Sequence, residues 1–449
     1  MCMTDETIIE LISGLVAAQV DAHEIFISRG SSFVVGIKEG EIELFKDSDY
    51  LGVALRILQQ RRPGFAYLGG FTEALARTMV ADAIGVAQSA TEDKAVSFPA
   101  PPATGYPEVA GFDATLADEP REVKVARAKT LESEALAVDP RIKKVRSAQY
   151  RESMFTVTLA NSTGLRATQQ GTAVSVSVTT LAADESGSEM GWDYQAERRA
   201  DRLDPAGVAR CAAQRALDSL GGRSLSSRKC PVIFTNQVVV EILGVLAASF
   251  RGDNVSKGKS LLKDRMGDLV FSPQLTIIDD GLYPGGVASA AFDDEGVPCR
   301  ETRLVENGRL TSFLYDTYWA TRAGGMSTGN ANRGDFKTPP FVSVSNLYIK
   351  PGATAFDSLV SQMHEGLVVE ELMGIHTADP ISGDFSVGCS GYWVEGGTRS
   401  FPVRGAAISG NVIDLFGKIG VVGNDLRFYG HEGAPSLLID EISLSGDGA

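Results

Sequence analysis

Histidine and cysteine are scarce in this sequence, which limits the catalytic chemistry that the chain can carry. Among 449 residues there are four histidines and five cysteines. No two cysteines form a C-x-x-C pair, and they lie far apart, at positions 2, 211, 230, 299 and 389. Because this is an odd, unpatterned set in a chain without an export signal, we expect free thiols in a protein of the reducing cytoplasm.

Long hydrophobic runs and a basic N-terminal region are also missing. A membrane-spanning helix needs about 18 or more consecutive apolar residues, and no such run occurs, so no membrane partner is expected. The first residues carry acids and no basic segment precedes the apolar part. They predict an amphipathic helix capped by Thr4 or Asp5 rather than a signal peptide.

Positive charge is in deficit. The chain has 42 Lys and Arg against 57 Asp and Glu, which gives a net charge of −15. Such a balance repels phosphate backbones and argues against direct binding of nucleic acid. The densest basic run, RIKKVRSAQYR at 141–151, is interpreted as a solvated helix or a strand edge.

The patterns that are present predict an α+β protein of two domains, because 449 residues exceed the size of one ordinary domain. The first, residues 1–222, is expected to be an α/β domain of helices and antiparallel strands. Its helices are predicted at 6–20, 71–90, 117–138 and 204–220. Its strands include a hairpin turning at 38–40 and the alternating run VSVSVTT at 174–180. The second domain, 223–449, is predicted to be β-rich and sheet-like or barrel-like, with few helices, one of them at about 236–250.

Three of the four histidines precede a glutamate, which is how the zinc-helix motifs H-E-x-x-H and H-E-x-x-x-H begin. These pairs start at His23, His364 and His431, whereas His376 precedes a threonine. The residues four and five places further on are Ile and Ser, Val and Val, and Pro and Ser. None of these side chains is a metal ligand, so the three pairs are interpreted as structural or surface features.

Other segments that could carry chemistry have structural interpretations as well. GCSGY at 388–392 lacks the final glycine of a nucleophile elbow, and Cys389 within it has no adjacent histidine. GLYPGGVASA at 281–290 lacks the G-K-[ST] of a phosphate loop and is interpreted as a turn. The acid clusters at 279–280 and 293–295 could gather a hard cation, although acids beside glycine more often belong to turns.

The stretch GDFSVGCSGYWVEGGTRSFPVRGAAISGNVIDLF, residues 383–416, is punctuated by glycines and predicts short strands joined by tight turns. Together with other segments of the second domain, it resembles the TldD/PmbA family, the modulators of DNA gyrase. Those segments are GKSLLKDRMGDLVFSPQLTIIDDG (258–281), AAFDDEGVPCRETRLVENGRLTSFLYD (290–316), STGNANRG (327–334), SNLYIKPG (345–352) and VGNDLRFYGHEGAPSLLIDEISLSG (422–446).

This resemblance implies a metal motif and shows where to look for it. TldD-like chains of the family carry H-E-x-x-x-H on a helix and a downstream cysteine, which bind a catalytic metal. PmbA/TldE-like chains lack these ligands and pair with a TldD-like partner. Placed on VVVEILGVLAASFRGD at 238–253, the motif falls on Val240, Glu241 and Val245. The segment expected to hold the cysteine reads RFYGHEGAPS at 427–436, with His431 and no cysteine.

The motif positions are therefore degenerate, and this chain resembles the PmbA/TldE kind. A step of five residues turns an ideal helix by about 500°, so a metal motif of this spacing requires a distorted helix. Without a metal to hold the distortion, we expect a regular buried helix. The resemblance implies no catalytic residue, no metal and no cofactor in this chain.

The function implied by the resemblance is that of a non-catalytic subunit of a cytosolic TldD/TldE-type metallopeptidase complex, which processes or degrades unfolded peptides. The expected partner is a TldD-like metallopeptidase subunit in a heterodimer, or a second copy of the chain in a homodimer. This chain would contribute architecture and substrate placement. Two other functions stay open: an independent homodimeric peptidase with an unrecognised site, and a protein-binding modulator of DNA gyrase.

Overall fold

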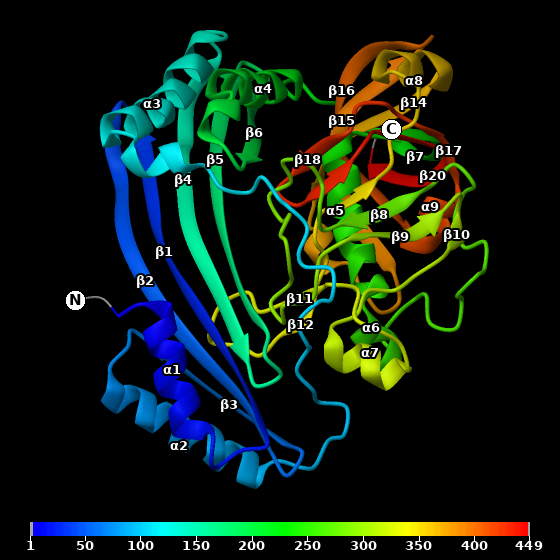
Figure 1. The fold of residues 1–449 in the computed structure, drawn as a ribbon. Helices are drawn as coiled ribbons and strands as arrows, with labels where there is room; N and C mark the ends of the chain where they lie inside the picture. Colours follow the sequence, from blue (N-terminus) through cyan, green and yellow to red (C-terminus); the bar gives the residue numbers. More distant parts are fainter. Residues whose placement is uncertain (1–2, 448–449) are drawn as a thin grey trace.

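A long antiparallel sheet forms the first half of the molecule. The structure is a computed structural model that describes residues 3–447. The sheet has six strands in the order β3-β2-β1-β4-β5-β6, and every neighbouring pair is antiparallel (Figure 1). Its strands are β1 Ala22–Lys38, β2 Glu41–Gln59, β3 Arg62–Gly69, β4 Ile142–Asn161, β5 Arg166–Asp184 and β6 Gly187–Glu197.

Four helices cover one face of this sheet. They are α1 Asp5–Val16, α2 Glu73–Ser89, α3 Arg121–Ala137 and α4 Pro205–Asp218. Alternate side chains of β1 point to this face, where Ile25 and Ile27 pack with α1 and α2, and Phe33 and Val35 pack with α3 and α4. The opposite face looks toward the second half of the chain, and Phe26 packs there in one cluster with Phe292. One face of the sheet therefore packs against the four helices, and the other face packs against the second half of the chain.

The predicted ends of these helices agree with the structure. The Thr4 side chain accepts a hydrogen bond from the Thr7 N–H at the start of α1, and Asp204 accepts one from the Gly207 N–H ahead of Pro205. The hairpin between β1 and β2 turns at Glu39 and Gly40, as expected. The basic run at 141–151 was interpreted incorrectly, because β4 lies between β1 and β5 and is neither a helix nor a sheet edge. Its Lys and Arg side chains are exposed, and the pairing register is irregular near the consecutive Lys143 and Lys144.

A barrel forms the centre of the second half. One six-stranded sheet has the order β16-β15-β14-β7-β20-β17, and an additional pairing of β16 with β20 closes it. Its strands are β7 Ser226–Phe234, β14 Gly366–Met373, β15 Asp384–Glu395, β16 Thr398–Asn411, β17 Ile419–Val422 and β20 Leu437–Asp447. The predicted α+β class and the barrel-like second half are confirmed, and the glycine-rich stretch 383–416 supplies β15, β16 and the start of the next helix.

A second six-stranded sheet, ordered β10-β9-β8-β13-β19-β18, and a two-stranded ribbon, β11-β12, complete this half. Their strands are β8 Ile277–Asp280, β9 Glu301–Glu306, β10 Arg309–Leu310, β11 Ala331–Asn332, β12 Phe341–Val342, β13 Leu347–Ile349, β18 Arg427–Tyr429 and β19 Glu432–Ala434. The helices here are α5 Asn236–Ala247, α6 Gly252–Ser256, α7 Thr317–Ala323, α8 Phe356–Met363 and α9 Val412–Gly417.

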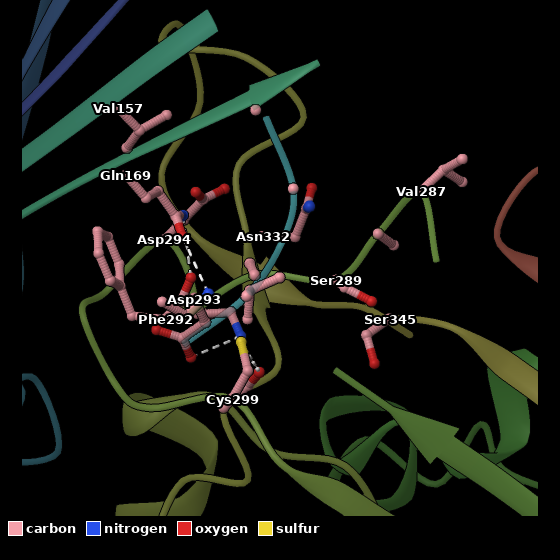
Figure 2. A pocket seen from close by; sticks show the side chains of 18 of the residues that line it. Val157, Gln169, Val287, Ser289, Phe292, Asp293, Asp294, Cys299, Asn332 and Ser345 are labelled. Carbon is pink, nitrogen blue, oxygen red and sulfur yellow. Dashed lines mark hydrogen bonds between the residues drawn. The ribbon is translucent and has the colours of Figure 1, made fainter. Parts of the chain in front are cut away.

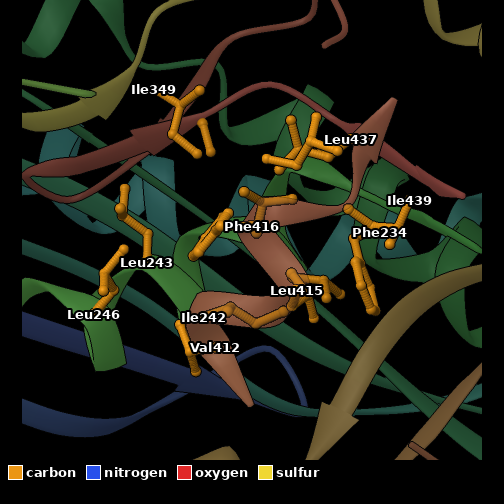
Figure 3. Close-up of a cluster of buried hydrophobic side chains, with 14 of the residues drawn as sticks. Phe234, Ile242, Leu243, Leu246, Ile349, Val412, Leu415, Phe416, Leu437 and Ile439 are labelled. Atoms are coloured by element: carbon orange, nitrogen blue, oxygen red, sulfur yellow. The ribbon is translucent and has the colours of Figure 1, made fainter. Parts of the chain in front are cut away.

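Helix α5 lies in the largest apolar core of the molecule. Its residues Ile242, Leu243 and Leu246 pack with Leu415 and Phe416 of α9 (Figure 3). Strands of both C-terminal sheets contribute to the same cluster. The helix is therefore fixed on most of its circumference by side chains from distant parts of the chain.

The strands of the first sheet all come from residues 22–197, and those of the other sheets come from residues 226–447. A domain boundary at 222/223 stays a prediction. Within residues 3–447, no helix is long and apolar enough to cross a membrane.

Candidate functional site

The predicted motif residues Val240, Glu241 and Val245 all lie on α5. The helix is a regular α-helix from Asn236 to Ala247, as expected. Val240 is buried, whereas Glu241 and Val245 are half-buried. Because an undistorted helix turns about 100° per residue, Val240 and Val245 lie on different sides of α5. The assignment of these three positions to a degenerate metal motif stays a prediction.

The fold brings α5 together with the segment in which a downstream cysteine was sought. Strands β18 and β19 form a hairpin beside α5, and the exposed His431 lies in its turn. Glu432 of β19 reaches the helix at Gly244, where a Cβ atom would lie 3.2 Å from Glu432 Oε2. Two segments that are almost 190 positions apart in the sequence thus lie side by side.

The carboxyl groups beside α5 are poorly solvated. Burial raises the pKa of Glu432 to about 7. Burial also raises the pKa of Glu241, opposed by a hydrogen bond from Gln237 and assisted by the nearby charge of Glu371. A carboxyl group that keeps its proton near neutral pH is a weak ligand for a cation.

The residues at this place do not fit the catalytic metal that the family motif implies. Zinc is held by thiolate, imidazole or carboxylate ligands, usually three or four of them, and the isopropyl groups of Val240 and Val245 offer no lone pair. Across residues 3–447, the structure has no group of three or more His, Cys, Asp or Glu side chains that could hold a metal ion. No step of a reaction through a metal on this chain can be derived from these side chains.

The other predicted candidates do not assemble into a catalytic site. Among the histidines, His23 lies on β1 near Ser13, His364 ends α8, and His376 lies in a 3₁₀ turn at 375–377. Cys389 is fully buried in β15, and burial raises the pKa of its thiol to about 12. A thiol of this kind is protonated and inaccessible, unlike a catalytic nucleophile.

The acid cluster at 293–295 belongs to a turn, as the neighbouring glycine indicated. Asp293 accepts hydrogen bonds from the backbone N–H groups of Glu295 and Val297, at 2.9 and 3.0 Å, and from Ala331 at 3.0 Å. Asp294 accepts from the Arg333 N–H at 2.7 Å. These carboxylates are used in holding the loop, and the segment 281–290 likewise runs through a series of turns.

A cavity of about 410 Å³ between the two halves was not predicted from the sequence. It is lined by residues of β4 and β5 on one side, and by residues 287–294, 329–332 and 343–345 on the other (Figure 2). The amide of Gln169 spans the boundary, donating to Phe292 O and accepting from the Ala291 N–H, both at 3.1 Å. The side-chain amide of Gln169 thus donates one hydrogen bond and accepts one, as a backbone amide does in a sheet. These two bonds connect β5 to the backbone of the loop.

A larger cavity of about 960 Å³ lies beside it, between the end of β6, the start of α4 and the β18 strand. No local sequence motif marks either cavity, because each is built from residues that are distant in the sequence. The two cavities can therefore be recognised only in the tertiary structure.

Comparisons with known proteins match most of the chain. Three models of PmbA/TldA metallopeptidase domains match residues 23–87 (domain 1), 114–220 (central domain) and 227–446 (C-terminal domain). The metalloprotease PmbA of Escherichia coli O157:H7 is 30% identical over 450 residues, covering 98% of this chain and 95% of that protein. The chain belongs to the TldD/PmbA family. This family is metallopeptidase-related, and the resemblance in the sequence is thereby confirmed.

Solved structures support the same fold. A Thermotoga maritima protein named as a modulator of a DNA gyrase superposes with a TM-score of 0.91 at 27% identity, covering 98% of this chain and 100% of that one. The structure of TldE from Thermococcus kodakarensis gives a TM-score of 0.90 at 22% identity, covering 98% and 99%. At that identity the second match shows the TldD/PmbA fold alone.

Proposed function

We propose that this chain is a non-catalytic, PmbA/TldE-like subunit of a TldD/TldE-type metallopeptidase complex that acts on unfolded peptides in the cytoplasm. The observation that carries the proposal is the composition of α5 and the hairpin beside it. The resemblance assigns the two imidazole positions of the family motif to Val240 and Val245 of this helix, and the 427–436 segment beside it contains no cysteine.

The chemistry of hydrolysis explains why a partner is needed. A glutamate of a metallopeptidase acts on a water molecule whose pKa a metal has already lowered. The resemblance assigns the glutamate position to Glu241, which is half-buried with a raised pKa, and no ligand set lies beside it in the described chain. A lone glutamate cannot lower the pKa of water, so we assign peptide cleavage to a TldD-like partner that carries the intact motif.

Other observations support parts of this proposal. The relative in Escherichia coli named PmbA is a metalloprotease by name, and its similarity extends over nearly the whole length of both chains. Cys211, Cys230, Cys299 and Cys389 are free thiols, as is typical of a reducing compartment; Cys2 lies outside the described residues. The cavities between the two halves give this chain a surface on which a peptide can be positioned.

The test measures metal content and cleavage of an unstructured peptide, for this chain alone and after mixing with a candidate partner that carries H-E-x-x-x-H. We expect no stoichiometric metal and no cleavage from this chain alone, together with activity from the mixture above that of the partner alone. Glutamine in place of the motif glutamate of the partner should abolish cleavage by the mixture. The matched change in this chain, Glu241→Gln, should leave it unchanged.

Each competing function predicts a different result. Chelator-sensitive cleavage by this chain alone, lost in Glu241→Gln, would establish an independent homodimeric peptidase and overturn the proposal. Capture of a topoisomerase rather than a TldD-like chain by the tagged protein would favour a modulator of DNA gyrase. Size measurements on the mixture distinguish a heterodimer from a homodimer of this chain.

A further inference from the structure

Arg198 is a buried cation that directly follows β6. The residue is 6% exposed. Its Nε donates to Gly286 O at 3.1 Å, its Nη1 to Thr172 O at 3.0 Å, and its Nη2 to Ser289 O at 2.7 Å. All three acceptors are uncharged backbone carbonyls, so these bonds fix the guanidinium without neutralising it.

No carboxylate pairs with Arg198 among residues 3–447. A guanidinium has five N–H groups, and three are used in the bonds above, which leaves two without a protein acceptor. Burial lowers the pKa of Arg198 to about 10, and no neighbouring acid offsets this effect. Buried charges in proteins are normally paired, because an isolated one is costly to desolvate.

Arg333, whose side chain is 1% exposed, and Arg56, whose side chain is 12% exposed, show the contrast. Arg333 forms an ion pair with Glu24, and Arg56 forms one with Glu295 at 2.9 Å. Burial is therefore accompanied by a counter-ion at those two positions and not at Arg198. An anion that enters from outside the chain would complete the site.

The position of Arg198 gives such an anion room. The residue lines both the cavity of about 410 Å³ and the cavity of about 960 Å³, so it forms part of the wall between them. Arg198 donates hydrogen bonds to Gly286 and Ser289 of one loop. Gly286 lines the larger cavity, and Ser289 lines the smaller one. An anion bound to Arg198 would thus lie where the two cavities meet.

The single charge of Arg198 favours a monoanion over a phosphate. The larger cavity is lined by Arg199, Arg202 and Arg427 as well as by acids, but Arg427 pairs with Asp193 at 2.8 Å and Arg199 with Asp201 at 2.8 Å. A phosphate group carries nearly two negative charges, and the single guanidinium of Arg198 would leave part of that charge unbalanced. A carboxylate carries one charge, which balances that of Arg198, and it accepts N–H groups of guanidinium in a strong charge-assisted geometry.

We propose that Arg198 binds a carboxylate of an unfolded peptide at the junction of the two cavities. The inference rests on the proposed function, which supplies the peptide. The carboxylate comes either from the C-terminus of the peptide or from an Asp or Glu side chain, since both present the same group. In either case, this chain selects how the peptide is placed, and the chemistry of cleavage belongs elsewhere.

The first experiment needs no variant. Affinities of the full chain, and of its complex with the partner, are measured for a fluorescein-labelled ten-residue unstructured peptide without internal acids. The peptide is made with a free C-terminal carboxylate and, in a matched version, with a C-terminal amide. We expect the free acid to bind roughly ten- to a hundredfold more tightly, the range of one strong charge-assisted contact. A third peptide, amidated but carrying one internal glutamate, recovers this affinity only when a side chain is the source.

The second experiment assigns the preference to Arg198. In Arg198→Met, the carboxylate-bearing and amidated peptides should bind equally, with the amidated peptide as tightly as to the wild type. Arg199→Met is the matched control, because Arg199 is the exposed neighbour paired with Asp201 and it also borders the larger cavity. It should retain the preference. Thermal unfolding of both variants checks that the loop still folds.

The outcomes separate the two proposals. Equal binding of all three peptides to the wild type would overturn the role of Arg198 while leaving the proposed subunit function intact. A preference that survives in Arg198→Met would overturn it as well. Failure of the chain and of its complex to bind any of these peptides would instead count against the peptide-handling function on which the inference rests.

Discussion

Glu24 and Arg333 form an ion pair that joins the two halves of the molecule. Arg333 Nη2 donates to Glu24 Oε1, and both side chains are 1% exposed. Glu24 lies on β1, whereas Arg333 directly follows β11 in the second half. Arg56 contacts Glu24 at 3.4 Å and Glu295 at 2.9 Å, which extends the network of charges across the same boundary. The position of the first sheet against the second half thus depends on buried charges as well as on apolar packing.

Replacing one partner should therefore cost much more than an ion pair usually does. We expect Glu24→Gln to lower the free energy of unfolding by about 3–5 kcal/mol, because it leaves Arg333 as a buried cation whose closest counter-ion is gone. Urea denaturation measures the change. In the matched surface variant Glu73→Gln, which removes the exposed helical pair with Arg77, the loss should be below about 0.5 kcal/mol. Equal effects of the two variants would show that the buried pair does not hold the halves together.

Glu432 beside α5 should make stability depend on pH. Its pKa is about 7 in the folded chain, against an ordinary value of 4.5. Between these values the folded state keeps a proton that the unfolded state has lost, so stability falls as pH rises from about 4.5 to about 7. Glutamine at this position has no proton to lose. We expect Glu432→Gln to be more stable than the wild type by up to about 3 kcal/mol at pH 8, and by much less at pH 4.5.

Unfolding by urea at both pH values tests this expectation. Glu441→Gln serves as the control, because Glu441 is half-exposed and pairs with Lys229 on the surface. Its difference from the wild type should be small at both pH values. A Glu432→Gln variant that is destabilised at pH 8 would mean that the ionised carboxylate is used there, for instance as a ligand.

Much of the fold follows from local patterns in the sequence. Thr4 and Asp204 start helices in the structure as they do in the sequence pattern, and the turn at Gly40 separates β1 from β2. Helix α3 was also predicted, but the burial of its charged residues was not. Lys124 is buried beside Glu152, and Glu132 is buried where it accepts the N–H groups of the β1–β2 turn. Such partners lie far away in the sequence, so this burial cannot be inferred locally.

The candidate site likewise has a part that could be predicted from the sequence and a part that could not. The valines at 240 and 245 stand out in the sequence only because the family resemblance predicts the two histidine positions of the metal motif there. The structure adds that Glu432 lies against the same helix. Arg198 carries no such signal. It is one of several arginines in 198–202, and only the tertiary structure distinguishes it from exposed Arg199. Burial without a counter-ion is a property of the assembled cavities, and no spacing of residue types encodes it.

Gly391, in the stretch that identified the family, should tolerate no side chain. A Cβ atom there would lie 1.9 Å from Val368 O of the neighbouring strand β14. We expect Gly391→Ala to lower the free energy of unfolding by about 3 kcal/mol, because backbone would have to move in a closed barrel. Gly85 in the middle of α2 has nothing within 4 Å of its Cβ position. The matched Gly85→Ala should stabilise by about 0.5–1 kcal/mol through helix propensity, and a neutral Gly391→Ala would contradict the register of β14 and β15.

Alkylation should separate structural from reactive cysteines. Cys389 is fully buried and the pKa of its thiol is about 12, and burial also raises the pKa of the buried Cys299 thiol well above its usual range. Because the thiolate is the reactive form, we expect iodoacetamide at pH 8 to leave both unmodified in the native protein and to modify both in urea, as peptide mass spectrometry would show. Half-buried Cys211 should react sooner than either. Rapid native modification of Cys389, with loss of any peptidase activity, would instead mark it as a nucleophile and reopen the case for an independent enzyme.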